Sequence, residues 1–231
     1  RLSLVGSEMC IRDRFIARTA GADGNNLYVV VVDKGADDTI VTPAAHGLSV
    51  GGTYTDDNTV GHEVVEVVNT TTFRIIRNGA APVPGAGTTA TVFSNSMWNA
   101  QQIGDTGLTY KEIGPRPGTS AFASERYVSY DEMHVAVIDT STNTVVERMT
   151  YLSKISDAKS PEGSSIYWKD YVNEFSGYIY AGALTSAEFT TLGEDPGGAV
   201  ASYGATSAAP IKIARILKTA GGALSGGTDD Y

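Results

Sequence analysis

The run from Leu27 to Val32, LYVVVV, constrains the fold of this chain more than any other segment. It is too short to cross a bilayer, and its length and β-branched residues are typical of a strand. Because the strand is apolar on both of its faces, we expect it in the interior of a sheet that is covered on both sides. The sequence therefore predicts a core built around a covered sheet.

The composition excludes several classes of protein. The chain has 231 residues, enough for one or two domains with their own cores, and its 26 glycines favour a β-rich fold with many turns. A formal net charge of −9 provides no electrostatic footprint for nucleic acid, and no apolar run is long enough to insert into a membrane. The single cysteine, Cys10, excludes an internal disulfide and a multi-cysteine zinc site.

The second half of the chain has the clearest secondary-structure pattern. Glu132–Asp139 (EMHVAVID) is predicted as a strand, and Thr144–Ser153 as its hairpin partner across a turn at 140–143. Tyr178–Ala181 is expected to be a short strand and Pro210–Thr219 a helix. Upstream, a turn at residues 21–26 is expected to end a helix and to lead into the strand at Leu27.

One amphipathic helix is predicted at Ser165–Glu174. Ser164 or Ser165 is a suitable cap for its start, and Gly177 is suited to end it. Its apolar stripe follows the spacing i, i+3, i+4 and i+7 and consists of Trp168, Tyr171, Val172 and Phe175.

The segment from Thr39 to Phe93 has the pattern of a small antiparallel barrel or sandwich. Two short strands flank a turn at His46–Gly47, a hairpin bends at Asn69–Thr71, and a last strand follows around Thr89–Phe93. The residues predicted to form its core are Val64, Val65, Val67, Val68, Phe73, Ile75 and Ile76.

The residues that most often carry catalysis are expected to be structural here. His46 lies in a turn, His62 in a β-pattern without the second histidine of a zinc-protease helix, and His134 in mid-strand near two carboxylates, where a pH-sensitive contact is the alternative. Ser120 lies in GTSAFAS, which superficially resembles a serine-protease motif, but on a loop before a strand. The acidic pairs 37–38, 56–57 and 229–230 lack EF-hand spacing and are expected to be solvated.

A family resemblance rests on Gly114–Asp139, GPRPGTSAFASERYVSYDEMHVAVID, and on the segment that follows it. Together they resemble the core of a contractile tail sheath protein of myovirus-type phages. Residues 15–33 also resemble the family's turn-plus-strand, A-R-x-P-G-x-x-G-N-x-L, with Ala20 in place of the proline and Asp23 where tryptophan is common. The resemblance covers residues 17–230 and is most specific at 116–139 and 152–182.

This resemblance implies an α+β or α/β fold, with a mixed sheet, flanking helices and an inserted small antiparallel β-domain. The implied division is sheath core over 15–38, inserted domain over 39–94, and sheath core again over 95–231. The implied function is structural: subunits polymerise around a tail tube and contract to drive it through the host envelope. No enzyme activity, cofactor or metal is expected. The implied partners are other copies of the chain and the tube, baseplate and tail terminator proteins, in the virion tail and, during assembly, the host cytoplasm, without nucleic acid or membrane insertion.

Five charged residues are candidates for the contacts between sheath subunits. Pro115 and Pro117 stiffen the loop around Arg116. An inter-subunit ion pair suits such an arginine, because contraction exchanges one set of contacts for another; local pairing is the alternative. Replacement of Arg116 by alanine is then expected to weaken assembly and leave the monomer folded. The candidates are Arg116, Arg126, Lys154, Asp157 and Lys159.

Three other interpretations stay open. The segment over 39–94 is compatible with a receptor- or carbohydrate-binding module of a tail or baseplate protein. A sheath of a bacterial contractile injection system has the same sequence pattern, and a serine hydrolase would use Ser120 with His134. Arg1–Arg14 resembles the translation of a sequencing adapter and is expected to be non-native, with the sheath sequence truncated at both ends.

Overall fold

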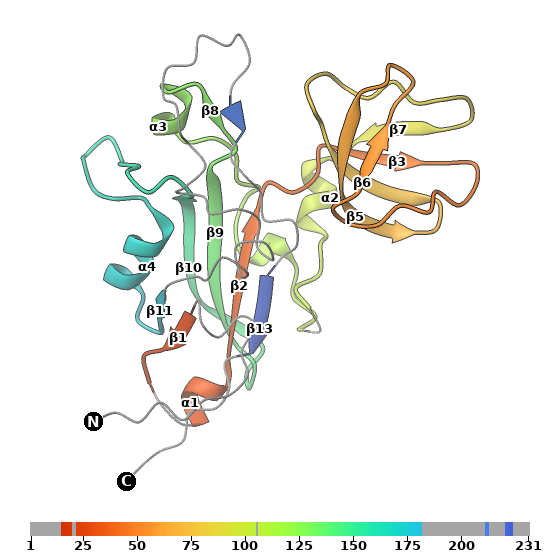
Figure 1. Ribbon diagram of the computed structural model, residues 1–231. Helices are drawn as coiled ribbons and strands as arrows, with labels where there is room; N and C mark the ends of the chain where they lie inside the picture. The colour runs from red at the N-terminus through yellow and green to blue at the C-terminus, as the bar shows by residue number, and fades with distance from the viewer. Residues whose placement is uncertain (1–14, 20–21, 105, 182–210, 213–219, 224–231) are drawn as a thin grey trace, which may run out of the picture.

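The computed structural model describes residues 15–19, 22–104, 106–181, 211–212 and 220–223. The protein is mainly β-structure, with three antiparallel sheets, one parallel pair of strands and a few short helices (Figure 1). Within these residues no sheet mixes parallel and antiparallel neighbours, so the mixed sheet expected from the sequence is not observed there. The segment at 1–14 and the acidic pair at 229–230 lie outside the described residues.

A four-stranded antiparallel sheet contains the apolar run Leu27–Val32. Its order is β10 (Thr144–Ser153), β9 (Glu132–Asp139), β2 (Leu27–Asp33) and β13 (Ala220–Ala223). The predicted strands at 27–32, 132–139 and 144–153 are therefore confirmed. Strand β2 lies between β9 and β13 and is therefore an interior strand of this sheet.

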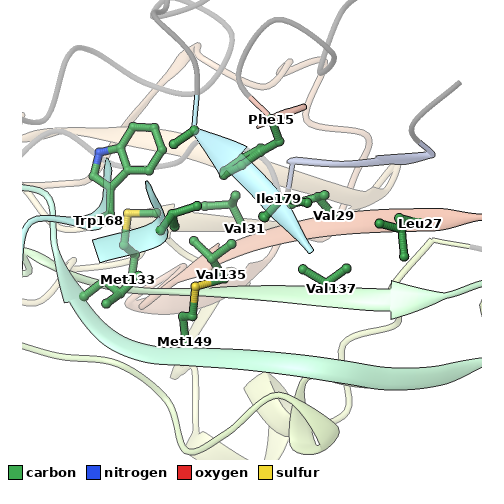
Figure 2. Packing of buried hydrophobic residues seen from close by; sticks show 13 residues of the cluster. Phe15, Leu27, Val29, Val31, Met133, Val135, Val137, Met149, Trp168 and Ile179 are labelled. Atoms are coloured by element: carbon green, nitrogen blue, oxygen red, sulfur yellow. The ribbon is translucent and has the colours of Figure 1, made fainter. Parts of the chain in front are cut away.

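Successive residues of β2 alternate between two separate hydrophobic clusters, one on each face of the sheet. Val29 and Val31 belong to the first cluster, and Val30 and Val32 to the second. Figure 2 shows the first cluster, where side chains of β2 and β9 meet Phe15 and Trp168. The second cluster contains residues from the segment after the five-stranded sheet, including α2 (Asn95–Asn99) and the 3-10 helix η1 (Tyr110–Glu112).

The first cluster is closed by two short strands that lie far apart in the sequence. Strand β1 (Phe15–Ala17) pairs with β11 (Ile179–Ala181), which confirms the strand predicted at 178–181. The expected helix before the first turn is wrong, because residues 15–17 are a strand and the turn itself forms α1 (Ala22–Asn25). The pairing of β1 with a strand far along the sequence decides its conformation.

Helix α4 (Trp168–Phe175) is shorter than the predicted helix at 165–174. Its N-cap, Tyr167, makes no side-chain cap bond, and its C-cap is Ser176. Ser165 accepts the backbone N–H of Tyr167 before the helix begins. Trp168 and Val172 are buried, as the stripe predicts, but Phe175 at the last turn is 54% exposed.

A second, five-stranded antiparallel sheet is built between Asp38 and Val92 (Figure 1, upper right). The strands predicted between Thr39 and Phe93 are confirmed. The sheet order is β4 (Thr53–Thr55), β5 (Gly61–Asn69), β6 (Thr72–Ile76), β3 (Asp38–Val41) and β7 (Thr89–Val92).

The core of the five-stranded sheet is smaller than the sequence predicts. Val64, Phe73 and Ile75 are fully buried, but Val67 and Val68 are 37% and 45% exposed. Strand β5 has two register shifts against β6, between residues 64 and 66 and between 67 and 69. Because each shift inverts the in–out alternation, the end of β5 presents its valines to solvent.

The remaining strands form one parallel pair. Strand β8 (Val128–Ser129), which follows helix α3 (Ala121–Ser124), pairs in parallel with β12 (Ile211–Lys212). The helix predicted at 210–219 is therefore wrong at residues 211–212, and its other residues lie outside the described ranges.

Strand β10 forms one edge of the four-stranded sheet and is irregular. Register shifts interrupt its pairing with β9 between residues 145 and 147 and between 149 and 152. Tyr151, in the second shift, has a φ of 58°. The longest uninterrupted run of pairs covers only residues 147–149.

Candidate functional site

Arg116 is the centre of the polar contacts in the loop that carries the family resemblance. Its guanidinium donates from Nε to the carbonyl of Lys34 (2.8 Å), from Nη1 to that of Phe93 (2.8 Å), and from Nη2 to that of Ala36. The same group lies 5.1 Å from the centroid of the Phe93 ring. Burial lowers the pKa of Arg116, which nevertheless stays charged, as arginine does in proteins.

These contacts commit the guanidinium of Arg116 to bonds within its own chain. All three nitrogens of the guanidinium donate to backbone carbonyls of distant segments. The expectation that Arg116→Ala leaves the monomer folded stays a prediction, to which these bonds add a loss of stability, because the substitution leaves partly buried carbonyls without their donors. Whether Arg116 also contacts another subunit stays a prediction.

The next residues of the loop are also bonded within the chain. The N–H of Gly118 donates to Oε2 of Glu132 (2.8 Å), and burial raises the pKa of that carboxyl. Ser120 is the N-cap of α3 and accepts the N–H of Ala123. The loop is thus fixed to the start of β9 on one side and to a helix on the other.

Ser120 is held by a buried carboxylate. Its hydroxyl and its N–H donate to the two oxygens of Asp131, both at 2.8 Å, and the hydroxyl of Ser153 donates to the same carboxylate at 2.6 Å. Asp131 and Ser153 have no exposed surface, and Ser120 is 6% exposed. This hydroxyl donates to an acid and not to a histidine base, so the arrangement lacks the contact that activates a serine nucleophile.

Each of the three histidines uses Nδ1 as an acceptor for a backbone N–H. The donors are Leu48 for His46, Asn78 for His62 and Tyr151 for His134. The proton of the neutral ring is therefore on Nε2 in every case.

The Nε2 groups are directed at structural acceptors. His46 donates to the carbonyl of Asn69 (2.9 Å) and His134 to that of Pro115 (2.7 Å), while His62 lies 3.5 Å from Asp56 Oδ2. The predictions of a backbone-bonded turn histidine and of a satisfied strand histidine are confirmed. His134 is fully buried, and this burial lowers its pKa.

Lys154 is a buried cation and not a surface residue. It is 1% exposed, and its Nζ lies 2.7 Å from Oδ2 of Asp33, itself 6% exposed. The other oxygen of Asp33 accepts the N–H of Gly35 (2.9 Å). The pair joins the end of β2 to the segment after β10, and Lys154 presents no ammonium surface to a second chain.

The other three candidates lie at the surface. Asp157 and Lys159 are exposed. Arg126 is partly exposed; its guanidinium donates to the carbonyl of Phe122 (2.9 Å) and lies 3.5 Å from the centroid of that ring. Its contacts are thus local, one helical turn apart. The structure does not gather the five candidates into one group, since two of them are committed to contacts inside the fold.

The acidic pairs are more structured than the sequence suggests. Asp38 is 2% exposed and forms a two-point ion pair with Arg77, from Nε and Nη2 at 2.5 and 2.6 Å. Asp37 pairs with Lys34. Asp56 accepts the N–H groups of Val60 and Val83, and these bonds, the one from Val83 first, lower its pKa. The expectation that the pairs at 37–38 and 56–57 are solvated turn carboxylates is wrong for these residues, except that Asp57 is exposed.

The contact between Arg116 and the ring of Phe93 was not predicted from the sequence. Phe93 is 3% exposed, and Arg74 of β6 also lies over its ring, 4.7 Å from the centroid. No motif marks this arrangement. The only signal was that Phe93 lies between strand β7 and a helix cap, Ser94.

Within the described residues there is no group of three or more histidine, cysteine, aspartate or glutamate side chains arranged to hold a metal ion. Nor is any helix among them long and apolar enough to cross a membrane.

No protein family model matches this chain, and neither a curated protein nor a solved structure matches it. Function is therefore inferred from the residues of the chain and their geometry.

Proposed function

We propose that this chain is a structural subunit of a contractile tail sheath, which polymerises around a tail tube and shortens to drive the tube through a host envelope. The proposal starts from the sequence resemblance at Gly114–Asp139. It includes the finer expectation of a sheath core with a mixed sheet and flanking helices, to which the five-stranded sheet belongs as an insert over residues 39–94.

The observation that carries the proposal is that the polar groups of the Gly114–Asp139 segment form hydrogen bonds within the chain. Arg116, Gly118 and Ser120 each donate to another part of the same chain, and His134 fixes the carbonyl of Pro115. A subunit that passes force between neighbours needs its loops tied to its sheets, since a loose loop would absorb the displacement. Intramolecular ties of this kind suit a scaffold.

The first candidates for contacts between subunits are Arg126, Asp157 and Lys159, while a contact through Arg116, whose guanidinium bonds to distant parts of its own chain, stays a prediction. All three lie at least partly at the surface, and they carry charges of both signs. Charged pairs at a subunit boundary are suited to reversible contacts, because they are screened, weak and readily exchanged.

Negative-stain electron microscopy of the protein expressed from its complete reading frame tests the proposal. We expect long, hollow, striated tubes. Dispersed monomers at every salt concentration would contradict the proposal and would favour a tail-associated binding module. A matched pair of variants then tests the surface: Lys159→Glu is expected to shorten the tubes, whereas Lys111→Glu, at an exposed lysine outside the candidate set, is expected to leave them unchanged.

A further inference from the structure

The two large sheets are connected by two segments of chain. The first, residues 34–37, leads from β2 into β3, and the second, residues 93–94, leads from β7 into α2. Strands β3 and β7 are neighbours, and Asp38 is paired with Val92. The two connections therefore lie side by side where the five-stranded sheet joins the rest of the molecule (Figure 1).

Arg116 bonds to both connections at once. Two of its nitrogens donate to carbonyls of the first connection, at Lys34 and Ala36, and the third donates to the carbonyl of Phe93 in the second. Arg116 itself belongs to neither, because it lies on the loop after η1. A planar guanidinium has donors on three nitrogens and can bond three carbonyls in fixed directions. The ammonium of a lysine is a single point of charge and lacks this geometry.

Another polar contact across this junction joins β6 to the residues after α2, where Nη1 of Arg74 donates to Oε1 of Gln101 (3.2 Å). The indole N–H of Trp98 donates to the carbonyl of Asp33 (2.9 Å) and joins α2 to the end of β2, on the side of the four-stranded sheet. Val65 of the five-stranded sheet packs against the cluster that contains Phe93 and Trp98.

The first connection has the backbone of a flexible joint. Gly35 has a φ of 66°, in the region that favours glycine, and an added Cβ would lie 3.7 Å from Trp98. Hinges are formed by a few residues at the ends of elements that absorb changes in φ and ψ. Held by Arg116, the same residues form a rigid link.

We propose that Arg116 is a latch that fixes the orientation of the five-stranded sheet relative to the four-stranded sheet. With the latch in place, the two sheets move as one body. Without it, the two connections act as a hinge. This device depends on the geometry of the junction and holds whether or not the chain builds a sheath.

The distance between the two sheets, measured by double electron–electron resonance, tests the latch. Spin labels on Thr55→Cys and Glu174→Cys report on the five-stranded sheet and on α4, since both positions are exposed. Cys10 is replaced by serine in every sample, because it is the single native cysteine. The variants are Arg116→Ala, Arg116→Lys and Arg126→Ala.

We expect a narrow distance distribution in the parent and one about twofold broader or more in Arg116→Ala, as for a released hinge. Hydrogen exchange of the amides of Asp37 and Phe93 should accelerate about tenfold; these amides are protected by bonds to Ile75 and to Asp37 in the two connections. Arg126→Ala is the matched control, because Arg126 also bonds a carbonyl and an aromatic ring, but only within its own segment.

An unchanged distribution and unchanged exchange in a folded Arg116→Ala protein would overturn the proposal. If that variant does not fold, Arg116→Lys decides. Lysine keeps the charge but not the three-nitrogen fork, so broadening supports the latch and a parent-like distribution refutes it. Equal broadening in Arg126→Ala would also refute it, since the effect would not be specific to the junction.

Discussion

Removing the ammonium of Lys154 should destabilise this protein far more than a surface lysine does. In Lys154→Met the side chain keeps a similar length, but Asp33 loses the cation that lies 2.7 Å from its carboxylate. Asp33 is 6% exposed, so water replaces the lost partner only poorly. The N–H of Gly35 still donates to Oδ1 of Asp33 and compensates for part of the loss.

The expected loss of stability follows from the burial of both Asp33 and Lys154. Breaking a buried ion pair by removing one partner costs about 3–5 kcal/mol, because it leaves an uncompensated charge. For a chain of this size each kcal/mol lowers Tm by about 2–4 °C, so we expect a fall of about 6–20 °C. The double variant Asp33→Asn/Lys154→Met should recover most of this loss, because asparagine keeps an acceptor for Gly35 and carries no charge.

Urea unfolding followed by tryptophan fluorescence measures these differences, with Lys159→Met as the matched control. Lys159 is exposed, and its loss should cost no more than about 1 kcal/mol. A loss in Lys154→Met as small as in the control would refute the reasoning. So would a double variant less stable than Lys154→Met, because the cost would then not come from the charge of Asp33 after the loss of its lysine.

Three further outcomes are expected. Burial lowers the pKa of His134, so the unfolded chain binds its proton more readily; the free energy of unfolding should therefore fall as pH drops below about 6.5, and urea midpoints at about pH 7.5 and about pH 5.5 should differ less in His134→Gln than in the parent. Arg116→Ala should lose about 2–4 kcal/mol of stability in urea unfolding against less than about 1 kcal/mol for Arg126→Ala, since charged donors to buried carbonyls are worth more than local surface contacts; equal losses would contradict this. Thr59→Asn should raise the free energy of unfolding by about 0.5–1 kcal/mol, because Thr59 is an exposed β-branched residue with a φ of 60°, a region that asparagine tolerates better; a lower urea midpoint would contradict it.

Strands β2, β9 and β10 of the four-stranded sheet were predictable because their patterns are local, whereas β13 was not predicted. Alternation or continuous apolarity over 27–32, 132–139 and 144–153 identifies strands whatever they pair with. Strand β1 was missed because three residues hold no periodicity, and its conformation depends on β11, more than 160 residues further along the chain. The exposure of Val67 and Val68 was missed because a bulge inverts the side-chain pattern without leaving a mark in the sequence.

The roles of the charged residues were less predictable than the strands. Arg116 was identified from its two flanking prolines, but the sequence does not reveal that its acceptors are carbonyls about 80 and 23 residues upstream. Lys154 was a candidate for a contact between subunits because it lies in a mixed-charge segment, LSKISDAK. Its burial depends on Asp33, which lies 121 residues away, and only the fold brings the two together.

The irregular edge strand β10 has a consequence for the behaviour of the protein at high concentration. A long, regular edge presents a row of unpaired N–H and C=O groups and is a template for amyloid-like stacking between molecules. In β10 the two register shifts leave no more than residues 147–149 in an uninterrupted ladder, and Ser153 is already bridged to Tyr167. Straightening the second shift by deleting Tyr151 would therefore lengthen the template and favour aggregation at that edge.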